Sequence, residues 1–258
     1  MVWSIDLSGK SIIVTGGNRG IGLGISRQCA EAGANVAIIY RSSPTAVDVA
    51  KEIAEKYNVK CVAYQCDVGE SKAVHALVRK VHTELGPVGG IVCNAGIVIV
   101  KPALEITKED FDSQINTNLW GVFNCAQAAA ALWKEIGYKD GRVVFISSAA
   151  GTIATKGVPM CFYNSSKSAL TMLAKSLAVE WADEGVLVNI LAPGFVSTEI
   201  NDAIFNTPEE KAALVAGVPL NRWSDVDEQA GVVVFMLSKY ASFCTGAQLI
   251  VDGGESVW

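Results

Sequence analysis

SIIVTGGNRGIG, residues 11–22, opens with a short run of apolar and β-branched residues and closes with glycines spaced Gly-x-x-x-Gly-x-Gly. A helical pattern begins directly after it, so the glycines lie in a turn between a strand and a helix. Gly16 permits a tight turn, Gly20 lets the backbone approach a pyrophosphate, and Gly22 allows close packing of the helix. The helix N-terminus would present its free N–H groups to the phosphates. The residues expected to hold a dinucleotide here are Gly16, Asn18, Arg19, Gly20, Ile21 and Gly22.

Further short apolar runs follow, separated by longer stretches with the periodicity of helices. The predicted strands are Ser11–Thr15, Asn35–Tyr40, Lys60–Gln65, Gly89–Cys93, Arg142–Ser147, Val186–Leu191 and Gln248–Val251. The predicted helices lie near residues 20–33, 44–57, 70–85, 108–136, 163–184 and 225–238. Most of the strands are apolar on both faces, which is typical of strands buried between two layers of helices. The sequence therefore predicts an α/β fold in a single domain over residues 1–258: a three-layer, doubly wound (Rossmann), mostly parallel seven-stranded sheet with helices on both faces.

One segment lacks the pattern of an element that packs on a sheet. Thr198–Leu220 is the longest such piece between two strand candidates. It follows the sixth predicted strand, and sheets of this class bind ligands beyond the carboxyl ends of their strands. Residues 198–220 are therefore expected to cover a substrate.

Composition limits the possible functions. The chain has 258 residues, 50% of them hydrophobic, and a net charge of −5 without a cluster of Lys or Arg. Binding to nucleic acid or to an anionic membrane needs such clusters, so neither partner is expected. No export signal and no apolar segment of about 18 residues is present, which favours a cytoplasmic protein acting on a small molecule. The seven cysteines and two histidines lack the spacing of metal ligands, so no metal site is predicted.

The end of the predicted second strand indicates which dinucleotide is bound. It reads Tyr40-Arg41-Ser42-Ser43, without the Asp or Glu that holds the ribose 2′-hydroxyl of NAD. The guanidinium of Arg41 and the hydroxyl of Ser42, helped by Arg19, instead suit a 2′-phosphate. Taken alone, Arg41 also fits the description of a solvated loop cation. Because the acid is missing, NADP(H) is the expected cofactor.

Tyr163 and Lys167 lie four residues apart at the start of a predicted helix, so their side chains share one face. A phenol has a pKa near 10 and acts as an acid and base near neutrality only if that pKa falls. An ammonium about 4 Å away supplies roughly the required 4 kcal/mol where the effective dielectric constant is near 20. The pair is therefore predicted to be the proton-transferring centre of a hydride-transfer reaction.

Several other short motifs fall at or just after the ends of predicted strands, and one lies in a helix. They are Asp67-Val68, Asn94-Ala95-Gly96, Ser148 in the pattern Ser-x-x-Gly with Gly151, Pro193-Gly194 and, in the helix, Asn118. Together with the glycine turn and Tyr163-x-x-x-Lys167, this set resembles the short-chain dehydrogenase/reductase family, in order, over essentially the whole chain. The resemblance implies an NADP(H)-dependent oxidoreductase acting on CH–OH groups.

The resemblance also implies catalytic roles. Tyr163 would give or take the proton, and Lys167 would bind the nicotinamide ribose and lower the pKa of Tyr163. Asn118 would hold a water in the proton relay. Ser148 would orient the carbonyl group, with Ser147 as a neighbouring support.

Cofactor contacts are implied in the same way. Asp67 and Val68 would lie near the adenine, Asn94 and Ala95 near the adenosine ribose, and Val196 and Thr198 against the nicotinamide carboxamide. The expected set is completed by Gly96, Pro193 and Gly194. Three members also have an ordinary structural reading: Asp67 as a turn former, Asn94 as a left-handed turn residue and Thr198 as a helix N-cap.

Within the family, the glycine turn, the Arg41-Ser42-Ser43 strand end and the ending Val251-Asp252-Gly253-Gly254 look most like fungal NADP-dependent mannitol 2-dehydrogenases and sorbose-reductase-like enzymes. That closer resemblance implies interconversion of D-fructose and D-mannitol, a reaction of polyol metabolism. A 3-oxoacyl carrier-protein reductase and a general ketone reductase are the enzymatic alternatives. A catalytically silent NADP(H)-binding regulator is the alternative outside enzymes.

Two further expectations concern partners. The stretch Ala178–Val186 carries three acids and no base, so it would repel an acidic carrier protein if it lay near the mouth of the site. The family resemblance and the apolar tail Ser256-Val257-Trp258 suggest self-association as a homotetramer.

Overall fold

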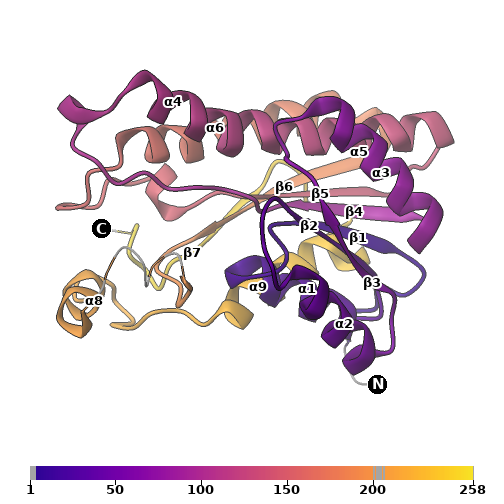
Figure 1. Ribbon diagram of the computed structural model, residues 1–258, viewed down its shortest axis with the longest axis horizontal. Helices are drawn as coiled ribbons and strands as arrows, with labels where there is room; N and C mark the ends of the chain where they lie inside the picture. The colour runs from indigo at the N-terminus through magenta and orange to yellow at the C-terminus, as the bar shows by residue number, and fades with distance from the viewer. Residues whose placement is uncertain (1–3, 200, 202–204, 206, 258) are drawn as a thin grey trace.

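The computed structural model describes residues 4–199, 201, 205 and 207–257, and its centre is a seven-stranded parallel sheet between two layers of helices (Figure 1). The strand order is β3-β2-β1-β4-β5-β6-β7. The strands are β1 Ser11–Thr15, β2 Asn35–Tyr40, β3 Cys61–Gln65, β4 Val88–Cys93, β5 Gly141–Ile146, β6 Val186–Pro193 and β7 Gln248–Val251. Every predicted strand is present with ends shifted by no more than two residues, and the predicted fold class is confirmed.

The sheet is covered on both faces, as the apolar strands require. The helices that pack on it are α1 Gly20–Glu31, α2 Ala46–Tyr57, α3 Ser71–Leu85, α5 Gly121–Ile136, α6 Cys161–Glu180 and α9 Val226–Leu237. The core on one face is made with α3, α5 and α6, and the core on the other with α1, α2 and α9. Successive residues of β1 point to opposite faces, so Ile13 joins the first core while Ile12 and Val14 join the second. A strand buried on both sides has to be apolar throughout.

The chain reverses its direction across the sheet between β1 and β4. β2 and β3 extend from one side of β1, and β4 returns to pair with the other side, with Val14 opposite both Ile38 and Val92. The connections that leave β1 and β4 at their carboxyl ends therefore diverge. Such a point opens a crevice in which this class of sheet binds its ligands.

The predicted helix near 108–136 is interrupted, which corrects that prediction. Helix α4, Lys108–Ile115, is followed by a π-helical turn, η2, over Asn116–Trp120, and only then by α5. Short π turns put an extra residue into a helix and are frequent at functional sites. The predicted helix near 163–184 also divides, because α6 ends at Glu180 and a separate 3-10 turn follows at Ala182–Glu184.

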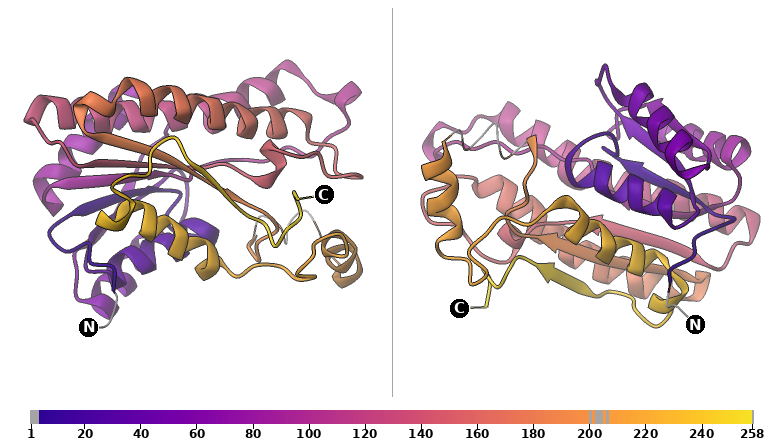
Figure 2. Two further views of the ribbon diagram at one scale, coloured as in Figure 1. Left: turned by 180° about the vertical axis from the view of Figure 1, so that it is seen from behind. Right: turned by 90° about the horizontal axis from the view of Figure 1, so that it is seen from below.

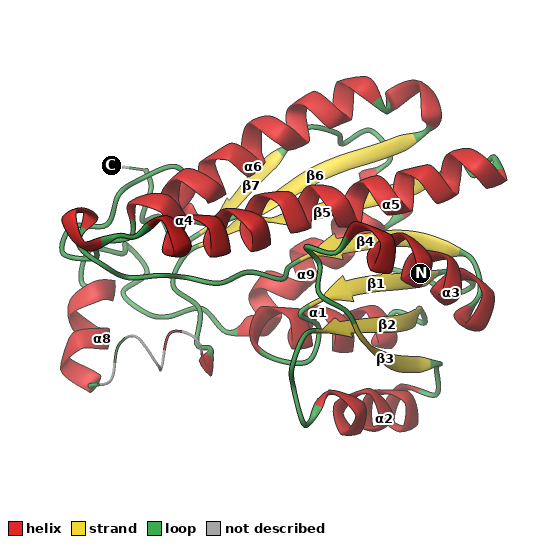
Figure 3. Ribbon diagram, turned by 45° about the horizontal axis from the view of Figure 1, so that its top comes forward, coloured by secondary structure: helices red, strands yellow, loops and turns green. Residues whose placement is uncertain are grey.

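The part of the segment 198–220 that the structure describes lies beyond the carboxyl ends of the strands, outside the two helical layers (Figure 3). Its described helix is α8, Pro208–Val215, which has a capping box formed by Thr207 and Glu210. Only Val215 of α8 is buried, which agrees with the absence of a sheet-packing pattern. Figure 2 shows that the segment after β7 runs to the same end of the molecule.

Among the helices in the described part of the chain, none has both the length and the apolar character that a membrane crossing demands.

Packing at the first turn leads to a prediction about stability. A Cβ atom on Gly22 would lie 2.2 Å from the carbonyl oxygen of Gly16 and 2.5 Å from Nδ2 of Asn94. We expect Gly22→Ala to lower the free energy of unfolding by about 1–3 kcal/mol, because backbone has to move to admit the methyl group. Urea denaturation measures this. Gly217→Ala is the control, since a Cβ there meets nothing within 4 Å; equal losses in both variants would contradict the packing argument.

Candidate active site

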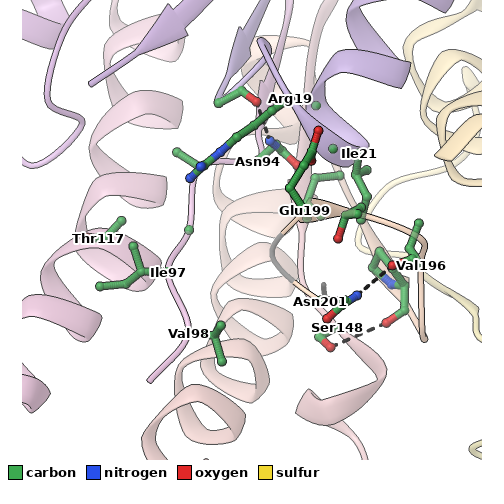
Figure 4. A pocket seen from close by; sticks show the side chains of 18 of the residues that line it. Arg19, Ile21, Asn94, Ile97, Val98, Thr117, Ser148, Val196, Glu199 and Asn201 are labelled. Carbon is green, nitrogen blue, oxygen red and sulfur yellow. Dashed lines mark hydrogen bonds between the residues drawn. The ribbon is translucent and has the colours of Figure 1, made fainter. Parts of the chain in front are cut away.

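A cleft with a volume of about 450 Å³ runs along the carboxyl ends of the strands, a size suited to a small ligand. The sequence-predicted site residues that line it are Gly16, Asn18, Arg19, Gly20, Ile21, Gly22, Arg41, Ser42, Asp67, Val68, Asn94, Ala95, Gly96, Ser148, Tyr163, Lys167, Pro193, Gly194, Val196 and Thr198. Figure 4 shows part of this wall, with Arg19 and Asn94 near one end and Ser148 and Val196 near the other. Asn118 is the one predicted residue that is absent from the lining.

The glycine turn is held by the end of β4. The hydroxyl of Thr15 accepts hydrogen bonds from the backbone N–H groups of Asn94 and Ala95, both at 2.9 Å. Nδ2 of Asn94 donates to the carbonyl oxygens of Thr15 at 2.9 Å and Gly16 at 3.2 Å. Gly16 and Gly20 have φ values of +65° and +51°, which glycine adopts without strain.

These bonds correct the alternative reading of Asn94 as a left-handed turn residue. Among the described non-glycine residues, positive φ occurs only at Asn58 and Asn221. The Asn94 side chain instead joins the two strands at the point where their connections diverge. Asp67 does form a turn, because its Oδ1 accepts a hydrogen bond from the N–H of Gly69, and it lines the cleft as well.

Two guanidinium groups lie at the dinucleotide end of the cleft. Arg19 and Arg41 are both exposed, and neither forms an ion pair with an acid in the described parts of the chain. The backbone of Arg41 is fixed because its carbonyl oxygen accepts a hydrogen bond from Nε2 of Gln65 at 2.9 Å. With Ser42 beside them, these charges suit a phosphate group, which binds guanidinium through charge-assisted hydrogen bonds.

Tyr163 and Lys167 face the cleft from the first turns of α6. Nζ of Lys167 lies 5.7 Å from the centroid of the Tyr163 ring and donates a hydrogen bond to the carbonyl oxygen of Ile146 at 2.8 Å. The lysine is 4% exposed, and burial lowers its pKa to about 8. Loss of solvent disfavours the charged form, so this lysine changes its protonation state close to neutrality.

The pKa of Tyr163 corrects a prediction. Burial of the phenol raises its pKa above the usual value, and the hydrogen bond with Ser148 opposes that effect only in part. The prediction that Lys167 lowers the pKa of Tyr163 is therefore wrong for the protein chain by itself. The simple Coulomb argument left out the cost of burying a phenolate. A nearby ammonium that is itself easily deprotonated is also a weaker source of positive charge.

The two neighbouring serines have different surroundings. Oγ of Ser147 is buried and donates to the carbonyl oxygen of Lys167 at 2.7 Å, which fixes the start of α6 against β5. Ser148 lines the cleft, where its Oγ accepts from the N–H of Ala150 at 3.2 Å and contacts the carbonyl oxygen of Pro193 at 3.5 Å. Of the two, Ser148 is the one placed to meet a ligand beside Tyr163.

Asn118 is fully buried in the η2 turn, behind the cleft wall. Its Nδ2 donates to the carbonyl oxygen of Ile97 at 2.8 Å and to Oγ of Ser166 at 3.2 Å, and its Oδ1 accepts from the N–H of Ile97 at 2.8 Å. Both side-chain protons are used by the protein. A Cβ on Gly96 would meet Oδ1 of Asn118 at 3.4 Å and Nζ of Lys167 at 3.6 Å, so only a glycine separates the asparagine from the lysine.

The far end of the cleft is formed after β6. Pro193 ends that strand, and Val196 is 1% exposed and bridged to Ser224. Thr198 precedes a helical residue, Glu199, as an N-cap would.

Sequence reasoning missed several lining residues. They include Thr155, Val158, Met160 and Glu255, while Glu199, Asn201 and Phe205, which also line the cleft, belong to the segment 198–220 that was predicted to cover it. Asn201 is fixed by a hydrogen bond from its Nδ2 to the carbonyl oxygen of Val196 at 2.7 Å. Phe205 packs on Trp223, with ring centroids 6.3 Å apart, and Trp223 also packs on Phe195 at 5.2 Å. A search for short motifs at strand ends overlooks residues that reach the cleft from the covering segment or the C-terminal tail.

The charge argument about Ala178–Val186 is wrong. Tyr163 lies in the first turn of α6 and Ala178 near its last turn, so the two are roughly 22 Å apart along the helix axis. Val186 begins β6 at the amino end of the sheet, opposite the cleft. The acids of this stretch therefore do not lie at the mouth of the site.

Known proteins are similar to this chain over almost its whole length. A family model described as "Enoyl-(Acyl carrier protein) reductase" matches residues 16–256. An NADP-dependent mannitol dehydrogenase of Alternaria alternata is 38% identical over 98% of this chain and 94% of its own length. The sorbose reductase SOU1 of Candida albicans is 35% identical over 96% and 88%. The 3-oxoacyl-[acyl-carrier-protein] reductase FabG of Staphylococcus aureus is 34% identical over 95% and 97%.

Solved structures are also similar over almost the whole chain. A short-chain type dehydrogenase/reductase from Mycobacterium marinum has a TM-score of 0.92 at 35% identity, with 97% of both chains covered. A gluconate 5-dehydrogenase from Burkholderia cenocepacia, solved in complex with NADP and tartrate, has a TM-score of 0.89 at 32% identity, covering 98% of this chain and 97% of that one.

Burial of Lys167 predicts an unusual dependence of stability on pH. The pKa falls from 10.5 to about 8 on folding, so at pH 7 the buried ammonium costs about 3 kcal/mol. Above pH 8 the folded protein releases this proton while the unfolded chain keeps it, so the wild type gains stability until about pH 10.5. Lys167→Met lacks this gain. Between pH 7 and pH 10 its unfolding free energy should therefore fall by about 2–3 kcal/mol when it is expressed as the difference from wild type.

Urea denaturation of both proteins across this pH range measures the difference. Lys175→Met, on the exposed side of the same helix, is the matched control and should show a flat difference. A difference between Lys167→Met and wild type that does not change with pH would contradict the assigned pKa.

Proposed function

The chain belongs to the short-chain dehydrogenase/reductase family and is an NADP-dependent oxidoreductase acting on CH–OH groups, and from that premise we propose that it interconverts D-fructose and D-mannitol. The proposed reaction is D-fructose + NADPH + H⁺ ⇌ D-mannitol + NADP⁺. The observation that carries the chemistry is the convergence of Ser148, Tyr163 and Lys167 on one cleft. The substrate is supported by two relatives that are named for mannitol and sorbose.

The residues of the cleft fit a dinucleotide. A Cβ on Gly22 would fill space that the turn needs, so this part of the wall is built from closely approaching backbone. Arg41 and Ser42 are placed to bind the 2′-phosphate, and the glycine turn to bind the pyrophosphate. When bound, NADPH supplies the hydride that reduces the ketone carbon.

The proton comes from the protein. In the proposed mechanism Ser148 donates a hydrogen bond to the carbonyl oxygen of the ketose, and the hydroxyl of Tyr163 gives that oxygen its proton as the hydride arrives at C2. Lys167 has a pKa of about 8, so its side chain can carry a proton near neutrality. The positive charge then balances the negative charge left on Tyr163 when the phenol gives up its proton. Both side-chain protons of Asn118 are already donated within the protein, so a relay water held by this residue would have to donate to one of its oxygens.

We also propose that residues 198–220 cover the bound substrate. Asn201 and Phe205 line the cleft, and the packing of Trp223 on Phe195 and Phe205 attaches this segment to the end of β6. A cover that excludes water strengthens the hydrogen bonds and charges that act on the substrate.

A 3-oxoacyl carrier-protein reductase is the second candidate, because the relative FabG is 34% identical over nearly the whole chain. A 3-oxoacyl thioester and a ketose both present a ketone to the same three side chains. The expected homotetramer and cytoplasmic location stay predictions.

Substitution of Tyr163 tests the mechanism. We expect Tyr163→Phe to lower kcat for ketone reduction at least 100-fold while it still binds NADPH, because only the proton donor is lost. The measurement is NADPH oxidation with fructose, sorbose, xylulose, an acetoacetyl thioester and cyclohexanone. The wild type should prefer fructose; a preference for the thioester would reject the proposed substrate, and undiminished turnover by the variant would reject the mechanism.

Substitution of Arg41 tests the cofactor site. We expect Arg41→Ser to raise the Kd for NADPH about 10- to 100-fold, because a charge-assisted bond to the 2′-phosphate is lost. The Kd for NADH should stay the same, since NADH lacks that phosphate, and this makes it the internal control. Fluorescence titration with both dinucleotides measures the change, and an equal effect on both would show that Arg41 does not contact the 2′-phosphate.

A further inference from the structure

The tail that follows β7 is folded back against the cleft. Gly253 and Gly254 have φ values of +67° and +91°, which turn the chain sharply. The carboxylate of Asp252 holds this turn, because its two oxygens accept from the N–H groups of Gly254 at 2.9 Å and Ser256 at 2.8 Å. The tail is packed on the end of β6 so closely that a Cβ on Gly194 would lie 2.6 Å from Cα of Asp252.

This turn places the side chain of Glu255 in the wall of the cleft. The residue is half-buried and hydrogen-bonded to Thr155, which belongs to the loop between Ser148 and Tyr163 and also lines the cleft. Burial and the nearby Asp252 raise the pKa of the Glu255 carboxyl group, and the bond to Thr155 opposes this. The mechanism proposed above has no use for this acid.

Charge is distributed unevenly along the cleft. The charged residues that line it are Arg19, Arg41, Asp67, Lys167, Glu199 and Glu255. The two arginines lie at the dinucleotide end, and Lys167 is directed to the carbonyl oxygen of Ile146. Glu199 approaches the glycine turn, since its Oε2 would lie 3.7 Å from a Cβ on Gly20.

The loop between Ser148 and Tyr163, which would border a ketone held by those two residues, contributes only uncharged residues to the lining. They include Thr155, Val158 and Met160. Glu255 is therefore the charged group on this wall, and no base there neutralises it among the described residues. A carboxylate in such a place accepts hydrogen bonds from hydroxyl groups and repels other anions.

We propose that Glu255 is a specificity-determining residue that binds the hydroxyl groups of a neutral polyhydroxy ketone and rejects anionic ketones. The hydroxyls that it binds belong to the part of the substrate remote from the reacting carbonyl, which Ser148 and Tyr163 hold. This inference rests on the proposed function. It deepens that function because it explains how one catalytic set can distinguish a sugar from a sugar acid or an acidic thioester.

The test compares Glu255→Gln with wild type on three ketones: fructose, which is neutral and hydroxylated, 5-keto-D-gluconate, which is anionic, and cyclohexanone, which has neither feature. For Glu255→Gln we expect kcat/KM to fall about tenfold on fructose, through KM, because a charged acceptor is replaced by a neutral one. It should rise about tenfold on the anion and stay within twofold on cyclohexanone. Glu31→Gln, an exposed acid at the end of α1, is the matched control and should change none of the three.

Two outcomes with Glu255→Gln overturn the proposal. If the variant loses activity equally on all three ketones, the tail has only a structural role; if nothing changes, Glu255 does not meet the substrate. Thr155→Val is the second variant, which removes the hydrogen-bond partner and keeps the acid, and it should change KM for fructose more than for cyclohexanone. If the wild type fails to reduce fructose, the proposed function is rejected. The activity of Glu255→Gln on 5-keto-D-gluconate still decides about Glu255: a higher kcat/KM than wild type supports the exclusion of anions, and an unchanged one overturns it.

Discussion

The site depends on the hydrogen bonds that join β1 to β4 at the point where their connections diverge. There the hydroxyl of Thr15 accepts from two backbone N–H groups at the end of β4, and the amide of Asn94 donates to two carbonyl oxygens at the end of β1. Buried backbone groups without partners cost several kcal/mol, and at a strand end no ladder supplies those partners. Two side chains satisfy them and thereby set the shape of the glycine turn. The space for a dinucleotide follows from that shape, since Gly22 packs directly against the carbonyl oxygen of Gly16.

A second constraint places the chemistry. Oγ of Ser147 donates to the backbone of Lys167, and the ammonium of Lys167 donates to the backbone of Ile146, so α6 is attached to the end of β5 by two buried bonds. The attachment buries a cation, which lowers its pKa to about 8 and opposes folding at neutral pH. The same burial raises the pKa of Tyr163. Burial of the ammonium is the part that opposes folding at neutral pH, and it leaves a group with a pKa of about 8 beside the phenol of Tyr163.

The limits of the sequence-based predictions follow from the same physics. Strands buried on two faces are mostly apolar, so β1 and β2 could be predicted to the residue, and the residues at strand ends could be assigned to one cleft. The break at Asn116–Trp120 carries no glycine or proline before Gly121, so periodicity alone did not reveal it. The pKa of Tyr163 was misjudged because Coulomb attraction was counted and desolvation was not. Glu255 was missed because its place depends on how the tail after β7 packs against β6.

The difference between residues at strand ends and residues in segments outside the sheet also explains why relatives of similar identity carry different names. The residues proposed to act on the carbonyl group, Ser148, Tyr163 and Lys167, lie after β5 and in the first turns of α6, which the parallel sheet holds in place. The remaining walls come from the loop after Ser148, the segment before α8 and the tail after β7, whose described residues lie outside the seven strands of the sheet. Such segments can change without disturbing the sheet. We therefore propose that substrate choice in this chain depends on side chains such as Phe205 and Glu255, which line the cleft but lie outside the motifs by which the family is identified.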